Sequence, residues 1–130
     1  MASGSKIHEF DPVIYPRKLW VVKGSSQRFI QDNFTERLGE EVVFENDEGN
    51  ESVCTVLSNV RLKETGKYGY LVYIRGNLSV GDIAHEATHV AARLFQEIGS
   101  YLDPENQEPF SYLVGWVTDC INQVKTGKSK

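Results

Sequence analysis

The segment His85-Glu86-Ala87-Thr88-His89 holds the side chains of this sequence that are best suited to chemistry. Two histidines four positions apart lie about one turn apart on one face of an α-helix, so both imidazoles can bind one metal ion. A glutamate directly after the first histidine lies beside that metal and can accept a proton from a water bound to it. Zinc suits this role because it polarises carbonyl groups and lowers the pKa of bound water to about 7. The spacing therefore predicts Zn²⁺ on His85 and His89, with Glu86 as general base.

A catalytic zinc site with two histidines needs a third protein ligand and keeps its fourth position for water. His8 is far away in the sequence and has no helix to position it. The residues after His89 (Val-Ala-Ala-Arg-Leu) exclude the extended pattern HExxHxxGxxH. The remaining candidates are the carboxylates that follow, namely Glu97, Asp103, Glu105, Glu108 and Asp119.

Glu108 is the preferred third ligand. A last helix that returns antiparallel to the histidine helix is expected to pass the histidines near its own first turns, where Glu108 lies. Glu105, one turn earlier, is the alternative. Asp103 is better explained as a helix N-cap, and Glu97 is expected to point away from the histidines.

A tetrahedral intermediate at such a metal also needs a donor to its oxyanion. Tyr112 follows Glu108 by four positions and shares its helical face, so it is the preferred donor. Tyr101 and Arg75 are alternatives, and a plain packing role is the competing interpretation of Tyr112.

Three helices are expected to surround these residues. Ser79 followed by Asp82 predicts a capped helix start, and apolar residues continue at helical spacing to about Ile98. Asp103-Pro104 predicts the start of a last helix that runs to about Lys125. A shorter helix is expected over residues 27–38, where apolar residues recur at helical spacing before Gly39.

Strands are predicted in the first two thirds of the chain, at residues 19–22, 41–45, 52–62 and 68–75. Turn sequences at residues 46–50 and 63–67 separate the later ones. These elements predict an α+β fold. Its sheet is expected to be an antiparallel meander of three or four strands, packed against two long helices and one shorter N-terminal helix.

The composition limits the domain number, the classes of partner and the compartment that we expect. The 130 residues predict one domain over residues 1–130, with flexible ends at 1–6 and 126–130. Asp and Glu number 18 against 14 Lys and Arg, a net charge of −4, which argues against a nucleic-acid partner. No apolar run is long enough to cross a bilayer, and the N-terminus lacks the apolar stretch of a secretory signal. Cys54 and Cys120 are therefore expected to be reduced core residues of a cytoplasmic protein.

Over residues 68–119 the chain resembles the gluzincin branch of the zincin-like metallopeptidases, in which HExxH is followed by a helix that carries a glutamate. The interval of 19 residues from His89 to Glu108 is similar to that of thermolysin-type enzymes. The run Glu-Pro-Phe-Ser-Tyr-Leu from Glu108 resembles the third-ligand helix of small phage- and mobile-element-associated metallopeptidases of the ImmA/IrrE kind. The segments HEFDPVIYPRKLW, HEATHVA and NQEPFSYLVGW together resemble a group of small proteins from bacteriophages and gut Bacteroides-type bacteria.

The resemblance implies a minimal zincin-like domain in which a substrate peptide adds to an edge strand beside the metal helix. Tyr68–Arg75, directly before that helix, resembles this strand. The predicted function is a zinc metallopeptidase, with a narrow or partner-presented substrate because the chain is too short for an enclosing second lobe. One alternative is a metal-containing zincin-like protein that docks a host protein without proteolysis, as a phage or mobile-element factor in the host cytoplasm. Another is a metal-free scaffold in which His85 and His89 form hydrogen bonds to protein groups.

Overall fold

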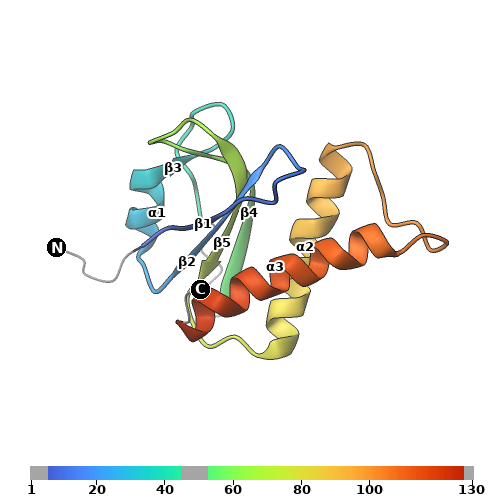
Figure 1. Ribbon diagram of the computed structural model, residues 1–130. Helices are drawn as coiled ribbons and strands as arrows, with labels where there is room; N and C mark the ends of the chain where they lie inside the picture. The colour runs from blue at the N-terminus through green and yellow to red at the C-terminus, as the bar shows by residue number, and fades with distance from the viewer. Residues whose placement is uncertain (1–5, 45–52, 128–130) are drawn as a thin grey trace.

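The computed structural model describes residues 6–44 and 53–127, which form a five-stranded sheet and three helices (Figure 1). The strands, in their order across the sheet, are β1 (His8–Phe10), β2 (Lys18–Lys23), β5 (Tyr68–Ile74), β4 (Cys54–Leu62) and β3 (Phe34–Thr35). The helices are α1 (Gln27–Asn33), α2 (Val80–Glu97) and α3 (Glu108–Thr126). The predicted α+β class is confirmed.

The sheet is mixed, so the predicted antiparallel meander of three or four strands is wrong. β2 runs parallel to β5, from the Lys18–Gly69 pair to the Lys23–Ile74 pair, and the other neighbouring strands are antiparallel. The physical reason lies in burial: β2 and β5 are almost continuously buried, as strands at the centre of a sheet with both faces covered must be. Their unbroken apolar runs (LWVV and YLVYI) are the signal of this arrangement.

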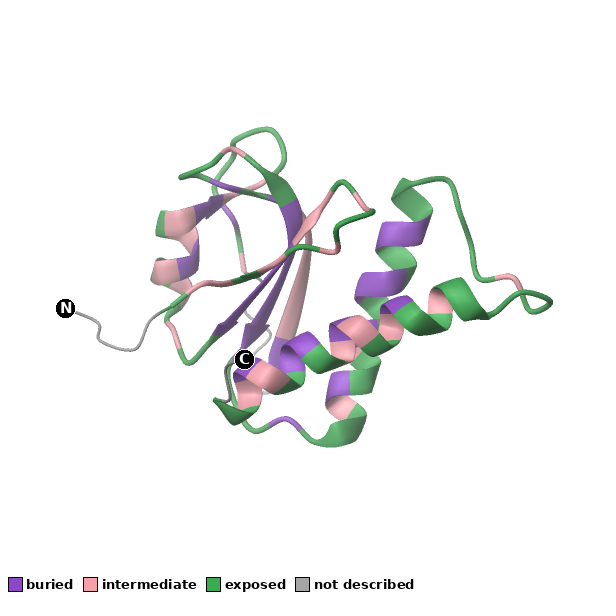
Figure 2. Ribbon diagram, in the orientation of Figure 1, coloured by how far each residue is buried: buried purple, intermediate pink, exposed green. Residues whose placement is uncertain are grey.

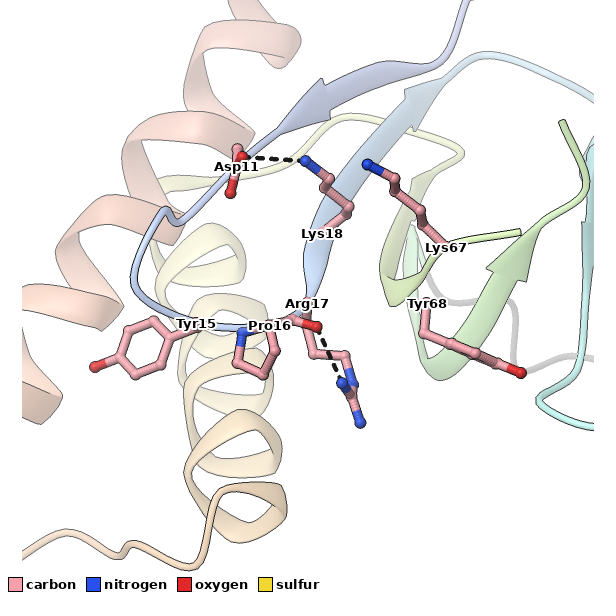
Figure 3. Close-up of a pocket in the computed structure, with 7 residues that line it drawn as sticks. All are labelled: Asp11, Tyr15, Pro16, Arg17, Lys18, Lys67 and Tyr68. Carbon is pink, nitrogen blue, oxygen red and sulfur yellow. Dashed lines mark hydrogen bonds and ion pairs between the residues drawn. The ribbon is translucent and has the colours of Figure 1, made fainter. Parts of the chain in front are cut away.

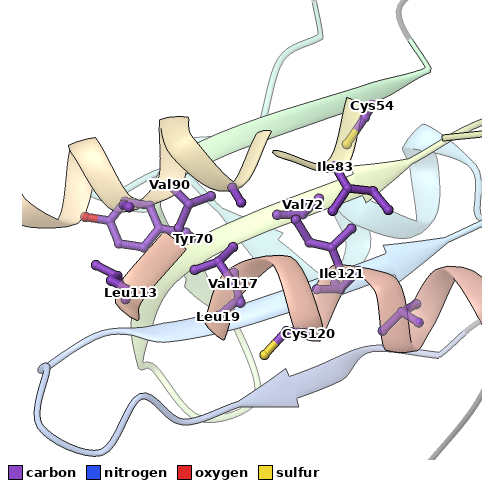
Figure 4. Close-up of a cluster of buried hydrophobic side chains, with 14 of the residues drawn as sticks. Leu19, Cys54, Tyr70, Val72, Ile83, Val90, Leu113, Val117, Cys120 and Ile121 are labelled. Atoms are coloured by element: carbon purple, nitrogen blue, oxygen red, sulfur yellow. The ribbon is translucent and has the colours of Figure 1, made fainter. Parts of the chain in front are cut away.

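Helices cover both faces of the sheet (Figure 2). β2 contributes residues to the core on each face. Leu19 and Val21 belong to the core under α2 and α3, whereas Trp20 and Val22 belong to the core on the other face, with Ile30 of α1. Figure 4 shows the first core, in which residues of β5, α2 and α3 interdigitate. α2 packs against β4 and α3 packs against β2, so the two long helices lie side by side across one face.

The start of α2 agrees with its prediction. The Ser79 hydroxyl accepts from the Asp82 N–H, and the Asp82 carboxylate accepts from the Ser79 N–H, each at 3.0 Å. The helix ends at Glu97, close to the predicted end. In the part of the chain that the structure describes, no helix combines the length and apolar character needed to cross a membrane.

The other two helices are shorter than predicted. α1 stops at Asn33, because Phe34 leaves the helix to pack its ring 5.3 Å from that of Trp20 and to pair with Leu62 in the sheet. α3 starts at Glu108, because Asp103-Pro104 forms a turn in which the Asp103 carboxylate accepts from the Glu105 N–H at 3.0 Å.

The strand predicted at residues 41–45 appears, over its described residues 41–44, only as an isolated bridge between Glu41 and Thr35, and residue 45 lies outside the described part of the chain. The strand predicted at 52–62 is β4, which begins at Cys54; residue 52 lies outside the described part of the chain, and residue 53 precedes the strand. The turn predicted at 46–50 lies outside the described residues too, as do residues 1–5 and 128–130 of the predicted flexible ends.

Two glycine-to-alanine changes are expected to have opposite effects on stability, one in the close contact of β2 with β5 and one on the exposed side of α3. A Cβ on Gly69 would overlap the Lys18 carbonyl oxygen and come within 2.7 Å of the Trp20 ring, so Gly69→Ala should lower the free energy of unfolding by about 2–4 kcal/mol. A Cβ on Gly115, on the exposed side of α3, has nothing within 4 Å, so Gly115→Ala should raise it by about 0.5–1 kcal/mol. Urea denaturation measures both. Equal stability of wild type and Gly69→Ala would contradict the parallel register.

Candidate metal centre

α2 presents the predicted metal residues on the side away from the core. Its buried residues recur at helical spacing (Ile83, Ala87, Val90, Ala91, Leu94 and Phe95). His85 and His89 lie outside this stripe and are exposed, while Glu86, at its border, is half-buried. The amphipathic pattern that anchors the helix therefore also fixes which side chains remain accessible to a metal.

The two histidine rings converge. The Nε2 atoms of His85 and His89 are 3.1 Å apart, and the ring planes are nearly perpendicular. Two nitrogens that bind one tetrahedral zinc at 2.0–2.1 Å are separated by about 3.3 Å, so the pair is close to ligand geometry. The same distance suits a hydrogen bond between the rings when one Nε2 carries a proton.

Glu86 lies at the junction of α2 and the start of β4. Burial raises the pKa of its carboxyl above the usual value, while His85 and His89 act in the opposite direction. Its negative charge also contributes to the raised pKa of the Cys54 thiol, which places Glu86 within electrostatic range of the first residue of β4. A carboxylate in this position can exchange protons with a group bound at the histidines.

The structure does not bring Glu108 to the histidines. Within residues 6–44 and 53–127, no three His, Cys, Asp or Glu side chains are grouped so that they could hold a metal. The start of α3 packs instead beside the end of α2, where the rings of Phe110 and Phe95 are 5.3 Å apart. Glu108 is exposed there, and its role as a ligand stays a prediction.

The other candidate carboxylates also lie apart from the pair. Glu97 points away from it, as expected: it accepts a hydrogen bond from the Tyr70 hydroxyl at 2.5 Å and pairs with Arg17 at 3.3 Å. Asp103 does not cap α3, which corrects that prediction, since the N-cap position belongs to Gln107. Glu105 and Asp119 are both exposed.

Of the three predicted oxyanion donors, Arg75 is the one that acts, like Glu86, on the Cys54 thiol. Arg75 and Glu86 both act on the pKa of Cys54, so both lie near the start of β4. Arg75 also donates to the Thr55 hydroxyl at 2.6 Å. Tyr112, by contrast, is 74% exposed on α3, and Tyr101 is 73% exposed in the loop before it. The sequence preference for Tyr112 depended on the position of Glu108 and has no other support in the structure.

The strand predicted to bind peptide is not an edge strand. Tyr68–Arg75 corresponds to β5, which pairs with β2 on one side and β4 on the other, so strand addition there is excluded. β4 offers the alternative. Its pairing with β3 involves only Arg61 and Leu62, so within the described residues its outer side at 54–60 carries no strand. This open edge lies beside α2 and contains a bulge at which Asn59 has a φ of 57°.

Comparison of the chain with protein-family models, curated proteins and solved structures gave no match. The zincin-like assignment therefore stays a prediction from the HEATH segment and the glutamate helix that follows it. The geometry contributes two convergent imidazoles, a half-buried carboxylate beside them and an open sheet edge.

Cys54 and Cys120 are buried thiols, as predicted, and neither forms a disulfide among the described residues. Burial raises the pKa of each thiol from 9.0 to about 12. Both thiols should therefore resist iodoacetamide in the folded protein at pH 8 and react once urea unfolds it. Because the folded pKa exceeds the unfolded one, their contribution to stability is complete below pH 9 and is lost as the pH rises toward 12. Mass spectrometry measures the labelling. Equally fast labelling of folded and unfolded protein would contradict the burial.

Proposed function

We propose that the protein is a zinc-dependent metallopeptidase that hydrolyses a peptide bond in a narrow or partner-presented substrate. The observation that supports this most is the convergence of His85 and His89, with Nε2 atoms 3.1 Å apart and Glu86 beside them on the same helix. Zinc held there would polarise the substrate carbonyl and acidify a bound water. In this proposal His85 and His89 hold the metal, and Glu86 accepts the proton of the water.

Glu108 is the proposed third ligand, with Glu105 as the alternative. The Glu108 side chain is exposed and takes part in no ion pair among the described residues, so metal binding would break none of them. Because Glu108 lies outside the histidine group, this ligand set requires the first turn of α3 to move along α2 toward the histidines when the metal binds.

We place the substrate peptide along residues 54–60 of β4. Main-chain hydrogen bonds to an open strand edge give affinity with little demand on sequence. The edge begins at Cys54, within electrostatic range of Glu86, so a peptide bound there would run toward the carboxylate that acts on it. Such a shallow site suits a substrate presented by a partner, in the host cytoplasm if the protein is phage-encoded.

The second candidate function is a metal-containing zincin-like protein that docks a host protein without proteolysis. It is favoured by one observation: the described residues contain no assembled group of three ligands, while both histidines are exposed. This docking function does not require the Glu86 carboxylate. Replacement of Glu86 therefore separates the two candidates.

Zinc binding should depend on the histidines. Loss of a residue that only supports a ligand costs 10–100-fold in metal affinity, so His85→Ala and His89→Ala should weaken zinc binding by about 100-fold or more. Glu108→Ala should weaken it less, and Glu86→Gln should leave it nearly unchanged. Isothermal titration with zinc measures these affinities, with Gln96→Ala, an exposed residue of the same helix, as control. A wild-type protein that binds no zinc would rule out the metal site.

Peptide hydrolysis should require Glu86. With zinc bound, Glu86→Gln should lower kcat by about 10²–10⁴-fold, because proton transfer by a positioned base contributes that much. Cleavage of a peptide library, read by mass spectrometry, provides the assay. The Glu86→Gln protein should also retain an uncleaved peptide and show slower hydrogen exchange at residues 54–60. Zinc binding without any cleavage by the wild type would instead support the docking function.

A further inference from the structure

The histidine pair of α2 supplies half of a closed zinc site. Structural zinc sites in proteins have four protein ligands at the corners of a tetrahedron. His85 and His89 provide two nitrogens, with Nε2 atoms 3.1 Å apart. Within residues 6–44 and 53–127, no third His, Cys, Asp or Glu is grouped with them. The shell is therefore two protein ligands short, which is the number that the same pair on a second copy of the chain would bring.

The pair lies where a second copy can reach it. Helical spacing places His85 and His89 opposite the buried stripe of α2, and both residues are exposed. The next residues along the same line of the helix are Gly81, four positions before the pair, and Ala92, three positions after it. Both are exposed and have shorter side chains than histidine. Along this line the two imidazoles therefore extend furthest from the helix axis and would be the first groups to meet a second α2.

The charges beside the pair suit a zinc ion between two copies. The Glu86 carboxylate is half-buried and lies within electrostatic range of both histidines. Two copies bring two such carboxylates, whose negative charges together balance the two positive charges of Zn²⁺. Without the metal, these carboxylates and the net charge of −4 on each chain oppose contact between the copies. Charge therefore favours association only when zinc is present.

We propose that one zinc ion joins two copies of the chain through four imidazoles, those of His85 and His89 in each copy. This inference rests on the zinc binding of the proposed function and adds a resting state of the same site. Four imidazoles fill the shell, so no position is left for a water or a substrate carbonyl, and the copies must separate before either can hydrolyse a peptide.

The contact between the two copies should be confined to the metal. In a tetrahedron, one pair of ligands lies at a right angle to the other pair. Each pair here follows its own helix, because its two histidines are one turn apart along α2. The two α2 helices should therefore cross at the zinc instead of packing along their lengths, and the dimer should depend on the metal.

The mass of the full chain in solution tests this arrangement. In sedimentation velocity with EDTA, the protein should be a monomer, and half an equivalent of zinc should double its mass. Native mass spectrometry of the same sample should show one zinc per two chains. His85→Ala and His89→Ala should each abolish the doubling. Thr88→Ala, at an exposed position between the two histidines, is the matched control and should leave the doubling unchanged.

Glu108→Ala separates the bridged site from the ligand set of the proposed function. The four-histidine shell does not use Glu108, so this variant should form the dimer with zinc as the wild type does. A dimer that needs Glu108 would overturn the four-histidine shell. A mass that doubles in EDTA would also overturn it, because the contact would then not depend on the metal.

The remaining outcomes distinguish this inference from the metallopeptidase proposal. A wild-type protein that binds zinc at the histidines and stays a monomer would overturn the bridge and leave the peptidase proposal intact. A zinc-dependent dimer that cleaves no peptide even at dilutions where the copies separate would support the bridge and contradict the peptidase. A protein that binds no zinc would overturn both.

Discussion

The structure depends on the parallel pairing of β2 with β5. This pair lies at the centre of the sheet, is buried on both faces, and forms the floor of both cores. Its close fit requires glycine at position 69, where the Lys18 backbone and the Trp20 ring leave no space for a side chain. Both helical layers rest on these two strands, since α2 and α3 pack on one face and α1 on the other.

The placement of the candidate metal centre follows from this arrangement. Because β2 occupies one side of β5, the strand before the histidine helix becomes central, and the open edge moves to β4. α2 then packs against β4, and Glu86 comes within electrostatic range of Cys54. The same central strands begin with Lys18 and Tyr68, which line a surface pocket together with Arg17 (Figure 3).

The features that the sequence predicted correctly are those that local interactions determine. The Ser79–Asp82 cap, the apolar stripe of α2 and the spacing of His85 and His89 all act within a few residues, and the structure has each of them. The expectations that failed depend on contacts between distant segments. Phe34 leaves α1 to pack its ring against that of Trp20, which is distant in the sequence. The late start of α3 is the exception, because the turn at Asp103 that delays it is local. The unbroken apolar runs of β2 and β5 already indicated two central strands, a signal that outweighs the order of strands along the chain.

The β2–β5 pair also has a consequence for how the chain folds. Its partners, such as Lys18 and Gly69, are 51 positions apart in the sequence, and the connection between them passes through α1, β3 and β4. A contact of such long range requires closure of a large loop before it can stabilise anything, which slows folding relative to a meander of neighbouring strands. During synthesis on the ribosome, β2 must therefore wait, with its apolar residues uncovered, until β5 has emerged. Only then do α2 and α3 have a completed sheet on which to pack.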